Sequence, residues 1–498
     1  MSGRLIAAAD EKAPGAVTSA PDPREVILAA NEIMLVVLCL GCVAVAYAFP
    51  FPAVKYGLMS FFGIMLLLQT LRRPAVGLAL LAFAVPAFDL IPTDLIPIPA
   101  VNAETLMILY ALFIWARANR MGGKEGVACP TGRIVLIYAL MIIASAVHSW
   151  LSWQTSLFNV LAWSKNHLAY LVFLPVSFHV LRSRRDQVLV LIACTASLFL
   201  NAISAIDHSF MAFVTGTLER HRASALLATQ ENIFGGAMAL YLPMLVVLGT
   251  NRLRSRFLTL WFLFGSAVVS FALLLTLSRG AWIAAVGGLL AVALFRARKL
   301  LIIFAIAALS YQLWVPAQMV ERVKQTTEET GDLAVAQVAD DSTQMRIEQY
   351  KSLPAMMYSS PVIGSGYKTF SEMFRRYGTL RRAKGAHSSY CQIGTEEGAV
   401  GLLVLLLIFA SLIRHAVAAT RLLEDPLYIW LAVGILGGAV SMLLCMASGA
   451  RFEAQRVFFY FWIIVGMVER ELVFARAAAE APQAGPALAL SEREGKGA

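Results

Sequence analysis

Long apolar runs separated by short polar connections form the dominant pattern of this 498-residue chain. A membrane-spanning helix needs about 20 mainly apolar residues, so the runs of suitable length predict about fourteen spans, or about twelve if early pairs of runs fuse or re-enter the membrane. The predicted spans are 26–48, 56–71, 74–91, 98–116, 134–150, 157–180, 188–207, 233–249, 257–277, 281–295, 300–315, 393–413, 427–447 and 457–470. The pattern therefore predicts an all-α fold, a polytopic membrane helix bundle.

One long polar segment interrupts the apolar pattern. It covers residues 316–392, and we expect it to be a partly helical loop between helical regions at 26–315 and 393–470. Residues 317–341 hold two basic and six acidic side chains, whereas residues 342–386 hold eight basic and two acidic ones. Cations concentrated in one half of a long loop favour an anionic ligand. We therefore expect this loop to form an active site.

The composition agrees with a membrane protein. Hydrophobic residues make up 59% of the chain and charged residues 14%, which leaves too little polar surface to cover a water-soluble globule of this size. The sequence contains no glycine-rich phosphate loop followed by lysine, and no soluble region that suits a nucleotide. We therefore expect no cofactor, no metal and no nucleic-acid partner. The energy for any reaction must then enter with the substrate or through an ion gradient.

Short basic connections between the spans predict the orientation. Under strict alternation they all fall on one face, which the positive-inside rule assigns to the cytoplasm. They lie at 72–73, 117–133, 182–185, 252–256, 296–299 and 414–421. The opposite face then carries the long loop, and the two ends of the chain, 1–25 and 471–498, are expected to be disordered cytoplasmic tails.

His387 is the strongest candidate for chemistry. It lies where the loop returns to the membrane, among small and hydroxyl-bearing side chains. An imidazole titrates near neutral pH and accepts a proton from a hydroxyl group in many reactions. The alternative is a surface histidine in a basic loop.

Arginines on the outer face are the candidates for substrate binding. Arg220 and Arg222 precede a span, Arg279 lies at the tip of a tight hairpin, and Arg346 opens the basic half of the loop. A guanidinium group presents a fixed fork of donors that matches phosphate oxygens. Together these arginines predict a diphosphate site, and the alternative is that they bind lipid headgroups.

Two further features concern charges near the spans. Lys165 lies within the predicted span 157–180, where a charge costs about 2.5 to 3.5 kcal/mol at the bilayer centre. Such a charge indicates a substrate-binding residue, unless the side chain extends to the interface. Asp89 and Asp94 resemble the acidic first-loop site of metal-dependent membrane glycosyltransferases, but no further acidic cluster accompanies them.

Taken in order, these outer features resemble the O-antigen ligase and polymerase superfamily. The shared pattern is an arginine before a span, a Ser-Arg-Gly hairpin, and a long loop that opens with an arginine and contains a Pro-x-x-Gly-x-Gly element. The loop closes with a histidine ahead of a Glu-x-Gly helix start. In this chain the corresponding residues are Arg220-His221-Arg222, Ser278-Arg279-Gly280, Arg346, 361–366, His387-Ser388 and Glu396-Glu397-Gly398. The resemblance covers roughly residues 220–405.

The resemblance implies a glycosyltransferase of the bacterial inner membrane, surrounded by membrane lipids. It would move a glycan from undecaprenyl pyrophosphate to a hydroxyl group of a lipid or saccharide acceptor on the periplasmic side. His387 would be the general base, and Arg222 and Arg346 would hold the pyrophosphate with support from Arg279. Ser388 stands where family members often carry asparagine, so we expect another group to orient the imidazole.

Two alternatives remain open at this point. A ligase and a polymerase use the same donor and differ only in the acceptor, so the sequence does not separate them. A secondary transporter of a small anion is the alternative from another class. It predicts broken spans with ionisable residues near the midplane, and Lys165 and His167 are its best support.

Overall fold

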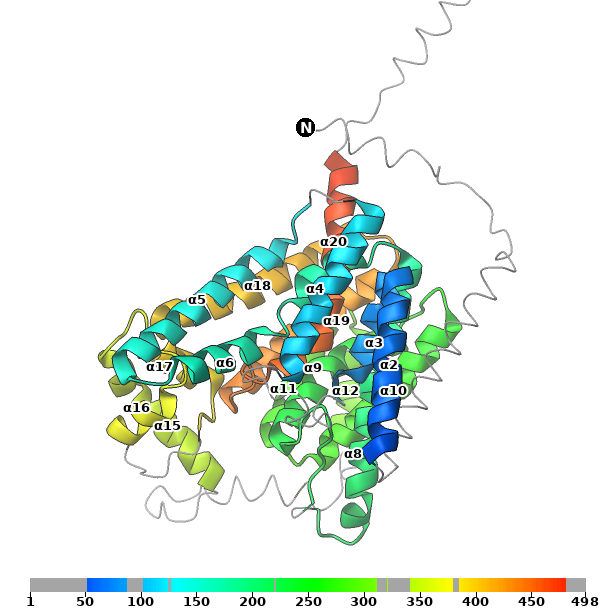
Figure 1. The fold of residues 1–498 in the computed structure, drawn as a ribbon. Helices are drawn as coiled ribbons and strands as arrows, with labels where there is room; N and C mark the ends of the chain where they lie inside the picture. The colour runs from blue at the N-terminus through cyan, green and yellow to red at the C-terminus, as the bar shows by residue number, and fades with distance from the viewer. Residues whose placement is uncertain are drawn as a thin grey trace, which may run out of the picture. The chain divides into compact units, whose positions relative to one another are not determined.

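The computed structural model describes residues 52–86, 102–123, 127–218, 221–310, 320, 341–378 and 385–480 (Figure 1). The predicted span 26–48 and most of the two predicted tails lie outside the described residues. The chain divides into two compact units, Met1–Arg72 and Arg73–Ala498. Each is described by itself.

The described residues form helices and the turns between them, apart from one isolated bridge between Ala225 and Ala228. This confirms the predicted all-α fold. The helices are α2 (Pro52–Arg72), α3 (Pro74–Ala84), α4 (Ala103–Gly122), α5 (Pro130–Trp153), α6 (Leu157–Leu168), α7 (Phe173–Val180), α8 (Arg184–Val214), α9 (Glu231–Thr250), α10 (Arg256–Leu275), α11 (Arg279–Phe295), α12 (Lys299–Leu309), α15 (Asp341–Tyr358), α16 (Phe370–Tyr377), α17 (Ser389–Glu396), α18 (Gly398–Leu422), α19 (Pro426–Ala447), the 3₁₀ helix η2 (Gln455–Phe458) and α20 (Phe459–Glu480).

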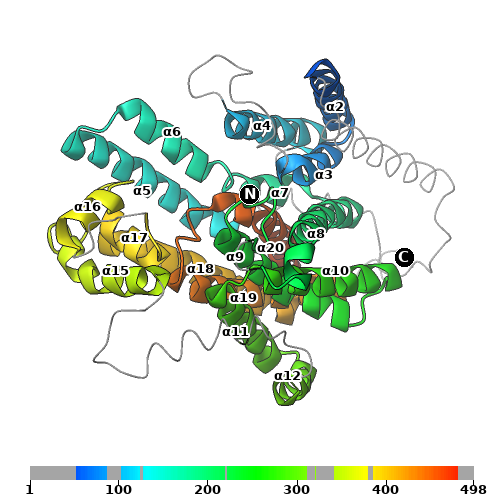
Figure 2. The same cartoon turned by 90° about the horizontal axis from the view of Figure 1, so that it is seen from below.

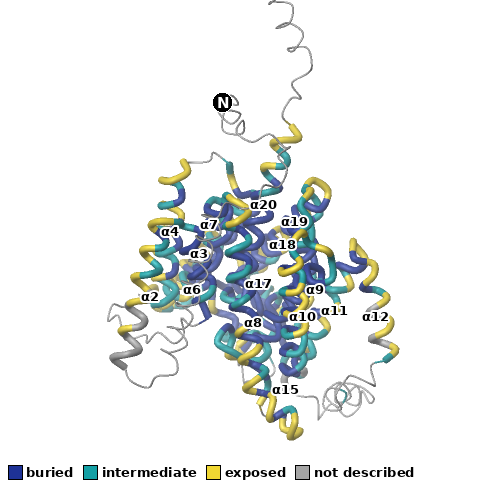
Figure 3. The backbone as a smooth tube through the Cα atoms, turned by 90° about the vertical axis from the view of Figure 1, so that its right-hand side faces the viewer, coloured by how far each residue is buried: buried dark blue, intermediate teal, exposed yellow. Residues whose placement is uncertain are grey.

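The first unit contributes one described helix, α2, which is mainly apolar along its length. In the second unit α9 and α19 are the most enclosed of the six long apolar helices. α9 packs on α10, α11 and α19, and α18 packs on α19, α5 and α20. Figure 2 shows α9 and α19 with these neighbours around them, and Figure 3 shows exposed positions on outer helices such as α12.

Small residues allow the central helices to approach closely. A Cβ atom on Gly288 of α11 would lie 2.5 Å from the carbonyl oxygen of Gly437 on α19. Helices in a membrane associate through such packing, because lipid is as apolar as their side chains. Large apolar side chains on the outer helices remain exposed, for example Phe257 and Leu260 on α10, as expected for a surface that faces lipid.

Six described helices are long and apolar enough to cross a membrane, namely α5, α8, α9, α10, α18 and α19. Each coincides with a predicted span, so the polytopic membrane class is confirmed. α3 and α11 are apolar but shorter. The total of about fourteen spans stays a prediction, because the described residues supply six helices of full length.

Two predicted boundaries differ from the structure. The predicted span 157–180 is two helices, α6 and α7, because the backbone between them forms i to i−3 bonds such as Phe173 N–H to the Tyr170 carbonyl (3.3 Å). Pro175 has no N–H group to continue an α-helical ladder through this turn. α20 continues to Glu480, so the predicted tail at 471–498 begins with helix.

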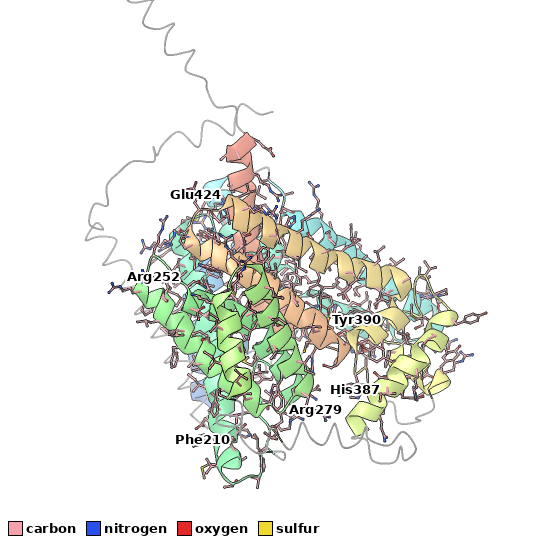
Figure 4. The ribbon with its side chains drawn as sticks, turned by 180° about the vertical axis from the view of Figure 1, so that it is seen from behind. Phe210, Arg252, Arg279, His387, Tyr390 and Glu424 are labelled. Atoms are coloured by element: carbon pink, nitrogen blue, oxygen red, sulfur yellow. The ribbon has the colours of Figure 1, made fainter. Side chains whose placement is uncertain are left out.

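The basic connections predicted to share one face do lie together. Ion pairs join Arg73 to Asp186 (2.6 Å) and Arg184 to Asp425 (2.7 Å). Arg182 donates a hydrogen bond to the Gly123 carbonyl (2.9 Å), and Arg296 donates one to the Thr420 carbonyl (2.7 Å). Figure 4 shows Arg252 and Glu424 at this end and Arg279 and His387 at the other. The sequence thus predicted correctly which connections share an end.

The Pro-x-x-Gly-x-Gly element attaches the loop to the end of α17. Ser365 N–H donates to the Thr395 carbonyl (2.8 Å), and Gly366 N–H donates to the Glu396 carbonyl (2.9 Å). Gly364 has φ +75°, and a Cβ atom there would collide with the Glu396 backbone. The glycines therefore permit a close, fixed contact between loop and helix.

Replacing Gly364 by alanine is expected to loosen this contact at a cost of about 1–3 kcal/mol. The purified variant should show a lower melting temperature and faster proteolysis of the loop than the wild type. Gly385→Ala is the matched control, because Gly385 has φ +64° but open space around its Cα. Equal melting temperatures for Gly364→Ala and the wild type would contradict the fixed contact.

Candidate active site

The turn that carries His387 is fixed by α15. The His387 backbone N–H donates to Gln349 Oε1 (2.7 Å), and Gln349 Nε2 donates to the Gly385 carbonyl (3.0 Å). Ser388 is the N-cap of α17, because its hydroxyl accepts from the Cys391 N–H (3.3 Å). His387 therefore lies at a well-defined junction between loop and helix.

One face of α15 contacts this junction and the end of α19. Arg346, Gln349 and Tyr350 follow one another at helical spacings of three and four residues, so they lie on the same face. The Tyr350 hydroxyl donates to the Ala447 carbonyl (2.8 Å) and lies 2.9 Å from Ser388 Oγ. This face explains how a loop residue such as Arg346 is brought beside His387.

The connection that follows α19 joins the loop to the outer hairpin. Arg346 Nε donates to the Ser448 carbonyl (3.1 Å). On the other side Gly280 packs so closely on Ser448 that a Cβ atom there would collide with the Ser448 hydroxyl. Arg279, the neighbour of Gly280, is thereby placed at the same connection as Arg346, and Figure 4 shows Arg279 and His387 at one end.

The outer hairpin also holds Arg222. Arg222 Nε donates to the Thr276 carbonyl (2.7 Å), and its terminal nitrogen donates to Asn232 Oδ1 (2.9 Å). Leu277, buried in the turn between α10 and α11, has φ +49°. A branched residue in this conformation is strained. The same backbone conformation forms the tight turn that places Arg279 at the start of α11.

Arg451 is a member of this group that the sequence analysis did not select. Its side chain is buried against Gly236 and Gly449, and its Nε has no acceptor among the described residues. A buried guanidinium donor without an acceptor is costly unless a ligand supplies one. Arg451 carries no motif signal in the sequence, and nothing in the apolar pattern indicates that the chain turns its side chain inward.

The arginines change the acid–base behaviour of His387. Burial lowers the pKa of its imidazole, and the positive charges of Arg346 and Arg451 lower that pKa further. The imidazole is therefore neutral near pH 7, the state in which it accepts a proton.

The pH dependence of activity follows from this environment. The neutral imidazole is the form that can accept a proton, so we expect kcat/KM to stay constant near pH 7 and to fall only below the lowered pKa. Arg451→Gln removes a positive charge, which raises the pKa and should move the acidic limb of the profile to higher pH. The measurement is kcat/KM between about pH 5 and 8. An acidic limb that stays in place, or moves to lower pH, would contradict the assignment.

Lys165 contacts a different part of the second unit from these arginines. Its ammonium group donates to Asn102 Oδ1 (2.9 Å) and Thr105 Oγ1 (2.5 Å), so it lies at the start of α4. Arg220 lies outside the described residues, and Arg222 is the one of the pair that the structure places at the hairpin. The role of Lys165 in binding the donor stays a prediction.

Asp89 and Asp94, the acidic alternative, also lie outside the described residues. Within the part of the chain that the structure describes, no group of three or more His, Cys, Asp or Glu side chains is arranged to hold a metal ion.

The family comparison covers the centre of this arrangement. Residues 264–406 match the family model described as O-antigen ligase. The O-antigen ligase match confirms the resemblance drawn from the motifs, and it includes Arg279, Arg346 and His387. This segment of the chain is accordingly similar to O-antigen ligases. Arg222 and Arg451 flank the matched segment, and the fold brings them to it. No curated protein sequence matches the chain.

Proposed function

We propose that the protein transfers a glycan from undecaprenyl pyrophosphate to an acceptor hydroxyl group at the outer face of the bacterial inner membrane. The observation that carries the proposal is the gathering of Arg222, Arg279, Arg346 and Arg451 around the same two turns, next to His387. Guanidinium groups are opposite in charge to a diphosphate and present donors whose geometry matches its oxygens.

The proposed reaction is a displacement at the anomeric carbon of the donor sugar. His387 takes the proton of the acceptor hydroxyl as its oxygen forms the new glycosidic bond. The bond from the anomeric carbon to the pyrophosphate oxygen breaks at the same time, and undecaprenyl pyrophosphate leaves with the electron pair. Preplaced arginines stabilise the charge that develops on this leaving group.

The orientation argument supports a periplasmic site. The basic connections that meet at one end of the second unit are those that the positive-inside rule assigns to the cytoplasm. Arg279 and His387 lie toward the opposite end (Figure 4). Under that assignment the donor reaches the site after it has crossed to the outer leaflet.

Reconstitution tests the proposal. The purified protein in lipid vesicles, given undecaprenyl-pyrophosphate-linked glycan as the only donor and a delipidated or lipid-bearing acceptor, should form glycosylated acceptor and release undecaprenyl pyrophosphate in equal amounts. Addition of nucleotide should have no effect. Absence of product with every acceptor supplied by the host envelope would contradict the proposal.

The choice between ligase and polymerase depends on the acceptor. Deletion of the gene in its host distinguishes them, because a missing ligase leaves polymer on the carrier lipid, whereas a missing polymerase leaves single repeat units. We favour the ligase, on the description of the family that residues 264–406 match.

An anion transporter has one specific observation in its favour. The break between α6 and α7 lies beside the buried His167, whose Nε2 is 2.7 Å from the Tyr138 hydroxyl. Transporters also place broken helices and ionisable groups within the bundle. Uptake of inorganic phosphate by proteoliposomes, with no glycan transfer, would favour this second candidate.

A further inference from the structure

A cavity of about 250 Å³ opens beside the loop at a place that the proposed reaction does not use. Its walls come from four parts of the second unit: the start of α4, one face of α6, the loop after Gly366, and the connection between α19 and α20. The residues that matter for its chemistry are Glu104, Trp163, Asn166, Tyr170, Lys368 and Glu453.

One face of α6 and its following turn supplies the aromatic wall. Trp163, Asn166, His167 and Tyr170 are spaced as neighbours on one helical face, and all four line the cavity. The Trp163 side chain is 44% exposed. An exposed indole next to an amide gives a flat apolar surface together with a donor and an acceptor.

The charges of the cavity occur as opposite pairs. Lys368 Nζ lies 2.7 Å from Glu453 Oε1, and a terminal nitrogen of Arg456 lies 3.4 Å from Glu104 Oε1. Two acids thus balance two bases along the wall. This balance differs from the cationic group around His387, so the cavity has no excess charge with which to attract a diphosphate.

The loop holds Lys368 in place through an unfavourable backbone conformation. Lys368 has φ +67°, and its ammonium group lies 5.6 Å from the centre of the Tyr367 ring. Tyr367 N–H donates to the Ser145 carbonyl on α5 (3.2 Å). Non-glycine residues with a strained backbone are concentrated at binding sites. Lys368 lies two residues after Gly366, the last residue of the Pro-x-x-Gly-x-Gly element.

A smaller cavity connects this wall to the helix that follows His387. It has about 10 Å³ of free space, enough for roughly one water molecule. It shares His167, Tyr367 and Glu453 with the larger cavity and extends to Ser389 and Gln392 on α17. The Gln392 Oε1 atom is buried there without a donor among the described residues. The larger cavity and the start of α17 after His387 are therefore connected through the residues that line the smaller cavity.

We infer that the larger cavity binds a saccharide unit, and this inference rests on the proposed glycosyltransferase function. A neutral sugar presents hydroxyl groups that both donate and accept, which suits the mixed Glu, Lys, Arg and Asn wall. Its apolar C–H face suits the exposed Trp163 ring. The saccharide belongs either to the donor glycan or to the acceptor, and both present the same chemistry to the cavity.

Binding measurements on the protein in lipid nanodiscs test this inference. The probes are the glycan released from the lipid-linked donor by mild acid, the delipidated acceptor saccharide, and sugar-free undecaprenyl pyrophosphate. Trp163→Ala should weaken binding of one saccharide by about tenfold, and Trp163→Phe should restore most of it. Lys368→Gln should weaken binding of the same saccharide. The saccharide whose binding is weakened shows whether the cavity holds the donor glycan or the acceptor.

The affinity for sugar-free undecaprenyl pyrophosphate should change less than about twofold in these variants, because the two sites share no charged group. This probe also shows that each variant is folded. Saccharide affinities that are unchanged in both Trp163→Ala and Lys368→Gln, or a wild type that binds neither saccharide, would overturn the inference. Failure of the wild type to bind undecaprenyl pyrophosphate would instead overturn the proposed function.

Discussion

Replacing His387 by alanine should abolish glycan transfer while leaving the protein in the membrane. The side chain is expected to take the acceptor proton, and positioned general bases contribute about 100-fold to 10,000-fold to a rate. Its backbone N–H, which bonds to Gln349 (2.7 Å), is retained in the variant, so the loop-to-helix junction should stay intact. Transfer is measured with undecaprenyl-pyrophosphate-linked glycan in vesicles, at equal amounts of wild type and variant.

His208→Ala is the matched control, because His208 is an exposed histidine on α8. It should transfer glycan at the wild-type rate. Full transfer by His387→Ala, with the control also active, would remove the proposed base. We expect His387→Ala to be inactive and still to bind undecaprenyl pyrophosphate. This result would show that the substitution removes proton transfer and not donor binding.

Replacing Arg346 by lysine should lower kcat/KM by about 100-fold, the range found for loss of one preplaced donor to a developing anion. The Arg346 guanidinium uses its Nε to bond to the Ser448 carbonyl (3.1 Å), which orients the remaining donors of the fork. A lysine has a single nitrogen and cannot keep this bond while presenting a fork to a phosphate. The measurement is kcat/KM for the lipid-linked donor.

Arg376→Lys is the control for Arg346→Lys. Arg376 lies on α16 of the same loop, exposed and above the Tyr377 ring (5.7 Å to its centre). This substitution keeps the loop's charge and should leave the rate within about twofold. If Arg346→Lys also retained the wild-type rate at low donor concentration, Arg346 would not hold the pyrophosphate.

The sequence predicted the membrane class and the shared end of the basic connections because both depend on local composition. Six predicted spans became full-length helices. It did not predict the break between α6 and α7, since apolar residues continue through the turn, where i to i−3 backbone bonds replace the α-helical ones. Span counting by hydropathy measures apolar length, and a broken helix has nearly the same apolar length as an intact one.

The site was partly predictable for a similar reason. Arg279, Arg346 and His387 carry motif signals, and the fold gathers their surroundings at one connection. Arg451 carries no such signal, because its importance comes from burial against Gly236 on a distant helix. Lys165 was selected for its intramembrane charge, yet its bonds are to the first turn of α4. Contacts between residues far apart in sequence decide both cases.

A cryo-EM map of the protein in nanodiscs with undecaprenyl pyrophosphate bound tests the central claim most directly. We expect diphosphate density within hydrogen-bonding distance of Arg222, Arg279 and Arg346, with the imidazole of His387 facing the site where the first sugar would be attached. Diphosphate density at the basic end near Arg184, or beside Lys165 at the start of α4, would contradict it.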